Sequence, residues 1–221
     1  MFDRPRRYDL IAFDWDGTLY DSTAVIARAI QAAVFEMGFP KPSDERARYV
    51  IGLGLTQALA YAAPDVPHER YPELARRYQH HYHAHLDDIS LFPGVLPMLA
   101  ALRERHHWLA VATGKSRRGL NDTLAHVEFQ GVFDASRTAD ETAGKPSPLM
   151  LFELMREFGV SPERTLMIGD TSHDLQMAKN AGCDSVAVSY GAHGGDGLDA
   201  YGARAVLHSV NDLHRWLMDH A

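Results

Sequence analysis

The sequence predicts an α/β fold, in which a Rossmann-like core with a parallel sheet carries an inserted all-helical cap domain. Short apolar runs alternate with segments that place apolar residues at helical spacing, which is the pattern of a mostly parallel sheet. One long stretch, residues 22–86, shows helical spacing alone and interrupts this alternation. We therefore expect a core at residues 1–20 and 88–221 and a cap at residues 21–87.

The expected strands are the short apolar runs, which lack polar alternation because both faces of a parallel sheet are covered by helices. They lie at residues 8–13, 108–112, 165–168, 185–189 and 203–207. The helices expected between and after them lie at residues 95–105, 117–127, 149–158, 173–181 and 210–218. Within the cap, the first helix is expected at residues 22–37, with Asp21 or Ser22 as its N-terminal cap.

Composition narrows the class of protein. The 221 residues carry a formal net charge of -7 and no long basic run, which argues against a nucleic-acid-binding surface. A single cysteine, Cys183, cannot form an internal disulfide, and the apolar run at residues 10–13 is too short for a signal peptide or a membrane span. We expect a cytoplasmic protein that binds neither nucleic acid nor membrane; the sequence predicts no oligomeric state.

Polar residues follow several of the expected strands directly. The carboxyl ends of parallel strands meet at one edge of a sheet, so these side chains should gather there. They are Asp14 and Asp16 after the first strand, Thr113, Gly114 and Lys115 after the second, Lys145 ahead of a later helix, and Asp170 and Asp174 after the third.

The chemistry of this set is that of an anion site with a cation. Carboxylates packed together repel one another, and without a cation at least one of them should stay protonated. Oxygen ligands suit Mg²⁺, which is commonly held by one or two carboxylates together with a substrate phosphate and water. A lysine and a threonine hydroxyl add donors for an anion, so the set indicates chemistry on a phosphoryl group.

Four motifs in this order strengthen that interpretation: DWDGTL at 14–19, ATGK at 112–115, GKPSP at 144–148 and IGDTSHD at 168–174. Together they resemble the haloacid dehalogenase superfamily of aspartate-nucleophile phosphohydrolases. The resemblance covers nearly the whole chain and is strongest to phosphoglycolate phosphatase-like members, which insert a helical cap after the first motif. Any one of these motifs alone would be weak evidence for the resemblance.

The resemblance implies a role for each matching residue. Asp14 corresponds to the nucleophile that forms a phosphoaspartyl intermediate, and Asp16 to the acid and base that serve the leaving group and the hydrolytic water. Thr113 and Lys145 correspond to the pair that holds the phosphoryl oxygens, and the backbone of Gly114 adds a phosphate contact. The magnesium ligands correspond to Asp14, Asp170 and the backbone carbonyl of Asp16, while Asp174 orients metal-bound water or Lys145.

The predicted function is a Mg²⁺-dependent phosphomonoester hydrolase that acts on a small phosphorylated metabolite such as phosphoglycolate. A sugar-phosphate mutase and a phosphonatase remain open, because both reuse the phosphoryl machinery. A non-catalytic module similar to a phospho-receiver domain remains open as a different class. Cap residues do not identify the substrate.

Other features have simpler interpretations. The histidines at 80, 81, 83 and 85 are expected on a solvated helix face, although His81 and His85 are spaced as zinc ligands could be. The glycines at 52 and 54 fit a tight turn between cap helices, with a loop facing the substrate as the competing view. Residues 191–195 are expected to be a plain loop, with a flexible segment that lines the mouth of the site as the alternative. Cys183 is expected to pack as a small apolar residue, and Trp15 to have no catalytic role.

Overall fold

The core of the molecule is a six-stranded parallel sheet. The computed structural model describes residues 7–125, 129–195 and 197–221. Its strands follow the order β3-β2-β1-β4-β5-β6, and all of their pairings are parallel. The strands are β1 (Leu10–Phe13), β2 (Trp108–Thr113), β3 (Ala135–Thr138), β4 (Thr165–Gly169), β5 (Asp184–Val188) and β6 (Val206–Leu207).

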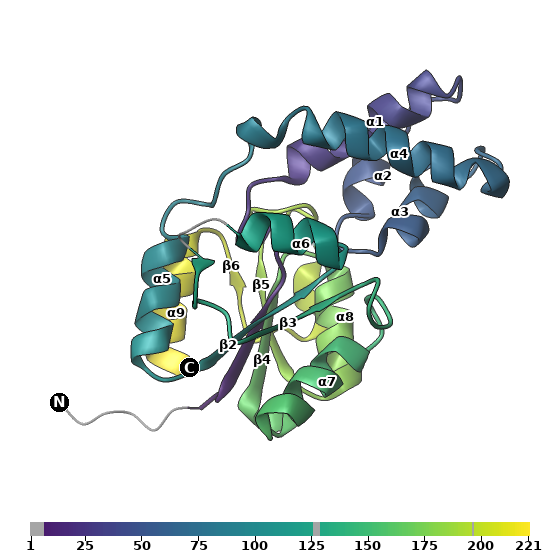
Figure 1. Cartoon of the computed structure of the whole chain (residues 1–221). Coiled ribbons are helices and arrows are strands. Elements are labelled where there is room, and N and C mark those ends of the chain that lie inside the picture. Colours follow the sequence, from purple (N-terminus) through teal and green to yellow (C-terminus); the bar gives the residue numbers. More distant parts are fainter. Residues whose placement is uncertain (1–6, 126–128, 196) are drawn as a thin grey trace.

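Helices cover both faces of this sheet, as the apolar strands require (Figure 1). Successive residues of β1 point to opposite faces: Ile11 and Phe13 pack with the helices α5 and α9, whereas Leu10 and Ala12 pack with α7 and α8. These helices are α5 (Val95–Glu104), α7 (Leu149–Phe158), α8 (Ser172–Ala181) and α9 (Val210–His220). The fifth core helix of the described residues, α6 (Arg117–Leu124), follows β2. The expected Rossmann-like core is thereby confirmed.

Most expected elements agree with the structure within a few residues, and two do not. The strand β3 was missed because its sequence, Ala-Ser-Arg-Thr, carries polar side chains, as an edge strand with a partly exposed face can. The expected strand at 203–207 shortens to the two residues of β6. Helix α6 ends at Leu124, and the last two residues of the helix expected there, 126–127, lie outside the described residues.

Four helices between β1 and α5 form a separate layer, here called the cap. They are α1 (Thr23–Glu36), α2 (Asp44–Tyr49), α3 (Leu55–Ala62) and α4 (Tyr71–His83), with short 3-10 turns at His68–Arg70 and Leu86–Asp88. Buried side chains from α1 and α3, including Ile30, Val34 and Leu59, join Leu74 of α4 in one apolar cluster. The cap lies beyond the carboxyl ends of the strands (Figure 1). Ligands of parallel sheets bind at that edge.

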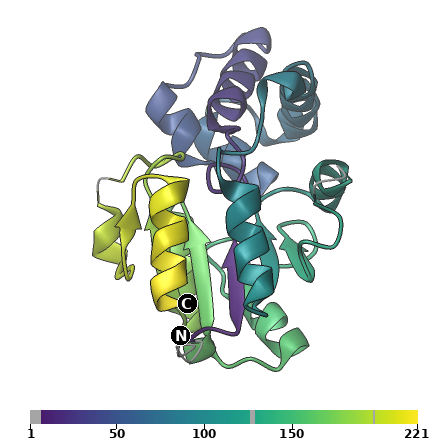
Figure 2. The same ribbon diagram turned by 90° about the vertical axis from the view of Figure 1, so that its left-hand side faces the viewer.

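Two chain segments connect the cap to the core, and they run side by side. Tyr20 forms an antiparallel bridge with Leu91. The amide of Asp21 donates to the Ser90 carbonyl at 2.8 Å, and the amide of Phe92 donates to the Leu19 carbonyl at 3.0 Å. Figure 2 shows the narrow junction between the two layers. The outgoing and returning segments are therefore fixed to each other at the junction.

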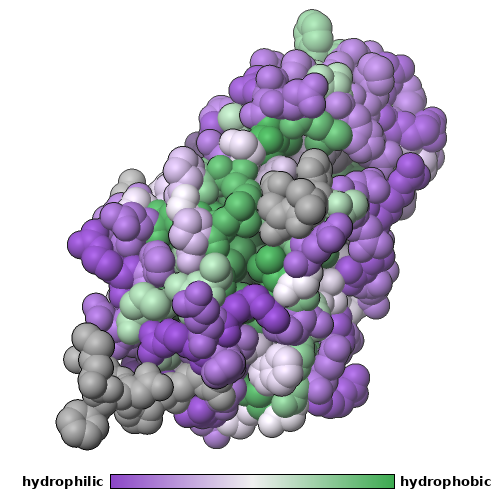
Figure 3. Space-filling model, turned by 60° about the vertical axis from the view of Figure 1, so that its left-hand side comes forward, coloured by the Kyte–Doolittle hydropathy of each residue, from purple (hydrophilic) through white to green (hydrophobic). Residues whose placement is uncertain are grey.

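The surface of the molecule is mostly hydrophilic. On the face seen in Figure 3, hydrophilic side chains cover most of the cap, and apolar colour gathers in a central strip on the core. Among the described residues, no helix is both long and apolar enough to cross a membrane.

Trp15 is the largest fully buried side chain near the strand ends. Its ring centroid lies 5.2 Å from that of Phe129 and 5.9 Å from that of Phe133, both at edge-on angles. Its indole nitrogen has no hydrogen-bond partner among the described residues. The residue between the two aspartates is therefore a packing residue of the core.

We predict that Trp15→Ala lowers the free energy of unfolding by about 3–5 kcal/mol, because it leaves a large cavity. Trp15→Phe should lower it less, since it keeps an aromatic ring and removes a buried N–H without a partner. Urea denaturation followed by far-UV circular dichroism measures both changes. A loss below about 1 kcal/mol for the alanine variant would contradict this packing role.

Candidate active site

The predicted site residues meet at the carboxyl ends of three neighbouring strands. Asp14 and Asp16 follow β1, Thr113 ends β2, and Asp170 follows β4. The amide of Asp14 donates to the Ile168 carbonyl at 2.9 Å, which continues the sheet pairing one residue past β1. The central position of β1 therefore brings Asp14 between the other two strand ends.

Lys145 lies at the centre of this group. Its ammonium nitrogen is 2.7 Å from Oδ1 of Asp14 and 2.6 Å from Oδ1 of Asp174, and all three side chains are buried. Asp174 is held in place because its Oδ2 accepts from the backbone amide of Thr171 at 3.1 Å, in the capping box of helix α8. Oδ2 of Asp14 has no hydrogen-bond partner among the described residues.

Asp170 is held from two sides. Its Oδ1 accepts from the Thr18 hydroxyl at 2.9 Å, and its Oδ2 accepts from the Ala192 amide at 2.6 Å. The backbone approaches so closely that a Cβ atom at Gly17 or Gly191 would overlap the Asp170 side chain. Gly17 also has a φ of 87°, a conformation that favours glycine. The loop at 191–195 is therefore part of the site, and its interpretation as a plain loop was wrong.

Burial dominates the electrostatics of these carboxyl groups. It raises the pKa of Asp14 to about 7, although the nearby Lys145 opposes the rise. It also raises the pKa of Asp170 well above its usual value, and the charge of Asp14 adds to that effect. Burial alone would lower the pKa of Lys145, but the two carboxylates outweigh it and the net pKa is raised. The ammonium is therefore charged.

The residues present fit a divalent cation. Asp14, Asp170 and Asp174 each offer a carboxylate oxygen within 4.8 Å of the others. Three carboxylates face one ammonium, so two negative charges lack compensation when all three are ionised. The partnerless Oδ2 of Asp14 is an oxygen donor of the kind that hard cations prefer.

Asp16 belongs to a second pair beside this cluster. Its two carboxylate oxygens lie 2.9 and 3.0 Å from the ammonium nitrogen of Lys115. The Ser22 hydroxyl donates to Oδ1 of Asp16 at 2.6 Å. Lys115 also donates to the hydroxyl of Tyr82, on cap helix α4, at 3.1 Å. Asp16 is therefore connected to the cap through one lysine.

A glycine turn of the cap reaches the core at this place. A Cβ atom at Gly114 would lie 2.5 Å from the Gly52 carbonyl oxygen and 2.6 Å from that of Leu53. On its other side, a Cβ atom at Gly52 would lie 3.3 Å from the Thr171 hydroxyl and 3.9 Å from Oδ2 of Asp14. The view that this turn faces the site is therefore right. Because Gly114 has no side chain, the turn can lie against the core.

The segment before this turn is fixed by two core histidines. The Nε2 atoms of His173 and His193 lie 2.8 and 3.0 Å from the Tyr49 carbonyl oxygen, so each ring donates to it. The His193 ring also stacks on the Tyr49 ring at 5.3 Å with an interplanar angle of 7°. Burial lowers the pKa of both histidines. They therefore act here as neutral donors that hold the end of helix α2.

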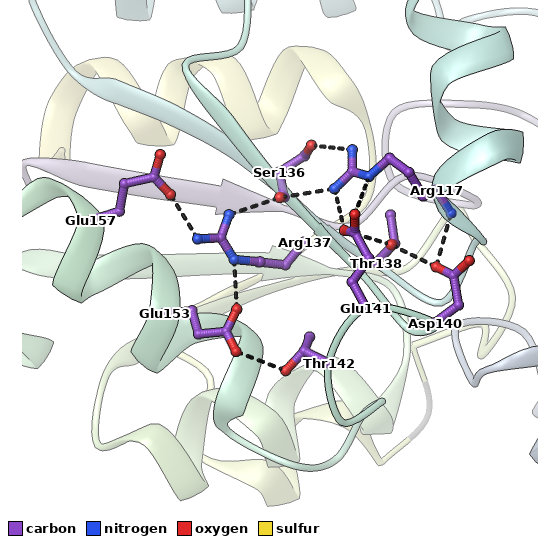
Figure 4. A network of polar contacts seen from close by, with 9 residues as sticks. All are labelled: Arg117, Ser136, Arg137, Thr138, Asp140, Glu141, Thr142, Glu153 and Glu157. Carbon is purple, nitrogen blue, oxygen red and sulfur yellow. Dashed lines mark hydrogen bonds and ion pairs between the residues drawn. The ribbon is translucent and has the colours of Figure 1, made fainter.

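An ion-pair network holds the loop that leads from β3 to Lys145 (Figure 4). Arg117 on α6 binds Glu141 at 2.6 Å and the Ser136 hydroxyl at 2.7 Å. Arg137 on β3 binds Glu153 and Glu157 of α7, each at 2.7 Å. Arg117 therefore contacts the protein itself, and it stabilises the loop before Lys145.

The remaining candidates are the cap histidines and Cys183. His81 binds Glu36 of α1 at 3.0 Å, while His80, His83 and His85 are exposed. Helix α4 ends at His83, so the expected helix face holds for His80 and His83 but not for His85, which lies beyond the helix, or for His81, which pairs with Glu36. In the described part of the chain, the only possible metal cluster of three or more groups is the aspartate one. Cys183 is partly buried beside apolar residues of the core.

Sequence reasoning gave no role to several residues that the structure brings to the site. Thr18 and Ser22 lie within the first motif and could have been found as hydroxyls near the aspartates. The other contacts come from segments distant in sequence and carried no motif signal. These residues are Tyr49, Tyr82, Ala192 and His193.

Comparisons with known proteins agree with this geometry. The family model described as haloacid dehalogenase-like hydrolase matches residues 11–188. A "Phosphoglycolate phosphatase" of Aliivibrio fischeri is 34% identical over 196 residues, covering 85% of this chain and 86% of the relative. A "Probable phosphatase IndB" of Dickeya dadantii is 33% identical over 209 residues, covering 92% and 91%. The crystal structure of a "predicted phosphoglycolate phosphatase" from Haemophilus somnus, 24% identical, matches with a TM-score of 0.84 over 96% of this chain and 99% of that one.

The chain therefore belongs to the haloacid dehalogenase-like hydrolase family. Within this family it is a phosphatase similar to the phosphoglycolate phosphatases. The alternative of a non-catalytic receiver-like module is wrong.

We predict that Gly114→Ala lowers kcat/KM for phosphomonoesters by about 10- to 100-fold, because the added methyl group displaces the Gly52–Leu53 backbone from the site. Steady-state kinetics with p-nitrophenyl phosphate measures the loss. The matched control is Gly119→Ala on α6, where the new Cβ atom would lie 3.4 Å from the Ser116 hydroxyl and alanine suits the helix. Equal kinetics for both variants would show that the close approach of the turn does not matter.

Proposed function

We propose that this phosphatase is a Mg²⁺-dependent phosphomonoester hydrolase that acts through a phosphoaspartyl intermediate on a small phosphorylated metabolite such as phosphoglycolate. The observation that carries the proposal is the buried Asp14 carboxylate, which has one oxygen on Lys145 and one oxygen without a partner among the described residues. Such a group is held in place by its neighbours yet keeps an oxygen for a new bond. The names of the relatives support the substrate class.

In this proposal, Asp14, Asp170 and the backbone carbonyl of Asp16 hold the magnesium ion. Asp174 is less suited to bind it directly, because one of its oxygens caps helix α8 and the other binds Lys145. It acts on Lys145 instead, by holding the ammonium in place. When bound, the ion offsets the excess negative charge of the site and draws electrons from the phosphoryl oxygens.

The side chains divide the reaction between them. An oxygen of Asp14 forms a bond to phosphorus while the bond to the leaving alcohol breaks, and Asp16 gives its proton to the leaving oxygen. A water molecule then attacks the phosphorus of the acyl phosphate, and its proton goes to Asp16. Phosphate leaves, and the Asp14 carboxylate is restored. Thr113 and Lys145 hold the phosphoryl oxygens, and the backbone of Gly114 contributes a further contact.

The cap separates these steps from bulk solvent, apart from the one water molecule that the second step consumes. The turn at Gly52 lies over Asp14 and Thr171, and Tyr82 lies over the Asp16–Lys115 pair. A covered site strengthens the electrostatic interactions of the phosphoryl group and protects the acyl phosphate from stray reactions.

No specific contact among the described residues supports the two alternatives within the family, a phosphonatase and a sugar-phosphate mutase. A phosphonatase of this superfamily needs a cap lysine that forms an imine. Lys41 is the sole lysine of residues 21–87, and it is exposed, beside Pro40 and Pro42 in a hollow on the cap. A mutase returns the phosphoryl group to the substrate, so the two reactions differ in whether phosphate is released.

We predict that phosphate release from 2-phosphoglycolate requires Mg²⁺, stops with EDTA, and falls at least about 1,000-fold in Asp14→Asn, which cannot act as the nucleophile. A colorimetric phosphate assay across a panel of phosphomonoesters measures this. Asp122→Asn, at an exposed position of α6, is a matched control that removes a carboxylate from outside the buried cluster. Full activity of a folded Asp14→Asn would refute the proposed mechanism, and an isomerised substrate without free phosphate would indicate a mutase.

We predict that binding of Mg²⁺ near pH 7 releases protons, because burial raises the pKa of Asp14 to about 7 and also raises that of Asp170. These groups hold protons below their pKa values and lose them above. Proton release should therefore diminish as the pH rises to 9, and the affinity should increase. Titration calorimetry in two buffers of different ionisation enthalpy counts the protons. Release that does not change between pH 7 and 9 would contradict the raised pKa values.

A further inference from the structure

Lys115 is a buried cation, and the proposed reaction gives it no contact with the substrate. Its ammonium nitrogen contacts both oxygens of Asp16 and the hydroxyl of Tyr82, at 2.9, 3.0 and 3.1 Å. Only 12% of its side chain is exposed. The ammonium is therefore held between Asp16 of the core and Tyr82 of the cap.

The place of this charge relative to the reaction follows from Asp16. In the proposed function, Asp16 gives its proton to the leaving oxygen, so the leaving alcohol has to lie beside Asp16. Lys115 lies against the same carboxylate, and Thr113, two residues before it, ends β2 beside β1. Lys115 is thus next to the alcohol part of the substrate, whereas Lys145 is next to the phosphoryl part.

The contacts of Lys115 cannot all persist during catalysis. Both oxygens of Asp16 bind the ammonium, yet a carboxyl group that protonates a leaving oxygen has to present one of its oxygens to it. At least one N–H of Lys115 then loses its acceptor. A buried ammonium that lacks an acceptor is costly, so an acceptor on the substrate is favoured at this point.

Tyr82 adds a second donor at the same point. Its hydroxyl oxygen accepts from Lys115, and its own O–H has no acceptor recorded within the described residues. Burial raises the pKa of Tyr82, so the phenol keeps its proton. An ammonium N–H and a phenol O–H on atoms 3.1 Å apart are suited to a carboxylate, which accepts on both of its oxygens.

We propose that Lys115 and Tyr82 form a subsite for a carboxylate on the alcohol part of the substrate, so that the enzyme selects phosphomonoesters of hydroxy acids over esters of neutral alcohols. This inference rests on the proposed function, because it takes Asp16 to face the leaving group. Since Tyr82 belongs to cap helix α4, the carboxylate also connects the cap to the core when it binds. Lys115 and Tyr82 therefore determine specificity, while Asp14 and Asp16 do the chemistry.

The experiment compares two esters of equal carbon number, 2-phosphoglycolate and 2-hydroxyethyl phosphate, which differ in the carboxylate. We expect the native enzyme to prefer 2-phosphoglycolate in kcat/KM by about 10- to 100-fold, the worth of a charged hydrogen bond. Lys115→Met should reduce this preference by a similar factor. Tyr82→Phe should reduce it by about 3- to 10-fold, because it removes one neutral donor. If one of these substitutions also disturbs Asp16, it lowers kcat/KM for both esters, and this loss cancels in the ratio of the two values.

The matched control is Lys179→Met, which makes the same substitution at an exposed lysine in the last turn of α8. It should keep the preference of the native enzyme. Circular dichroism tests whether Lys115→Met folds. If it does not, Lys115→Arg takes its place; this variant keeps the charge and should retain part of the preference. A ratio in folded Lys115→Met and Tyr82→Phe that equals the native ratio overturns the subsite.

The experiment distinguishes a failure of the subsite from a failure of the proposed function. If the native enzyme releases phosphate equally well from both esters, the subsite is overturned and the phosphomonoester hydrolase stands. If it releases phosphate from neither ester nor from any other in the panel, the proposed function fails and the subsite fails with it.

Discussion

Excess negative charge buried at one edge of the sheet is the constraint on which the rest of this structure depends. Three carboxylates share one ammonium out of contact with water, and burial already pushes the pKa of Asp14 and Asp170 upward. Such a group of like charges is unstable unless each member is held by bonds from elsewhere. The capping box of α8, the Thr18 hydroxyl and the Ala192 amide supply those bonds. The site is thus prepared for a cation and a phosphoryl group.

The cap is fixed to the core by contacts with the residues that surround this charge. The Gly52 turn lies against Gly114, the Tyr49 carbonyl accepts from His173 and His193, and Tyr82 accepts from Lys115. His173, Gly114 and Lys115 lie next to Asp174 or Thr113 in sequence, and His193 follows Ala192, whose amide binds Asp170. A movement of the cap would therefore change the surroundings of the reacting groups directly. In the proposed function, recognition of the substrate and exclusion of bulk water depend on this same set of contacts.

Much of the fold could be predicted because its signals are local and strong. Buried strands such as Leu10–Phe13 are short apolar runs, and helices such as Leu149–Phe158 show apolar residues at helical spacing. The strand Ala135–Thr138 escaped because its pairing with β2 comes from tertiary structure and its composition carries no strand signal. The loop at 191–195 escaped for a related reason: its glycine-rich sequence is typical of any loop, and only its approach to Asp170 gives it a role.

From the sequence by itself, phosphoryl transfer could be predicted, because Asp14, Asp16, Thr113, Lys145 and Asp170 lie in motifs whose order and residue types indicate it, and because a parallel sheet brings strand ends together. Only the tertiary structure decided which groups pair. It placed Lys145 on Asp14 and Asp174 but Lys115 on Asp16, and it set a tyrosine of the cap beside the second pair. The physical reason is that ion pairs and hydrogen bonds act over about 3 Å between side chains far apart along the chain, and no periodicity in the sequence records such distances.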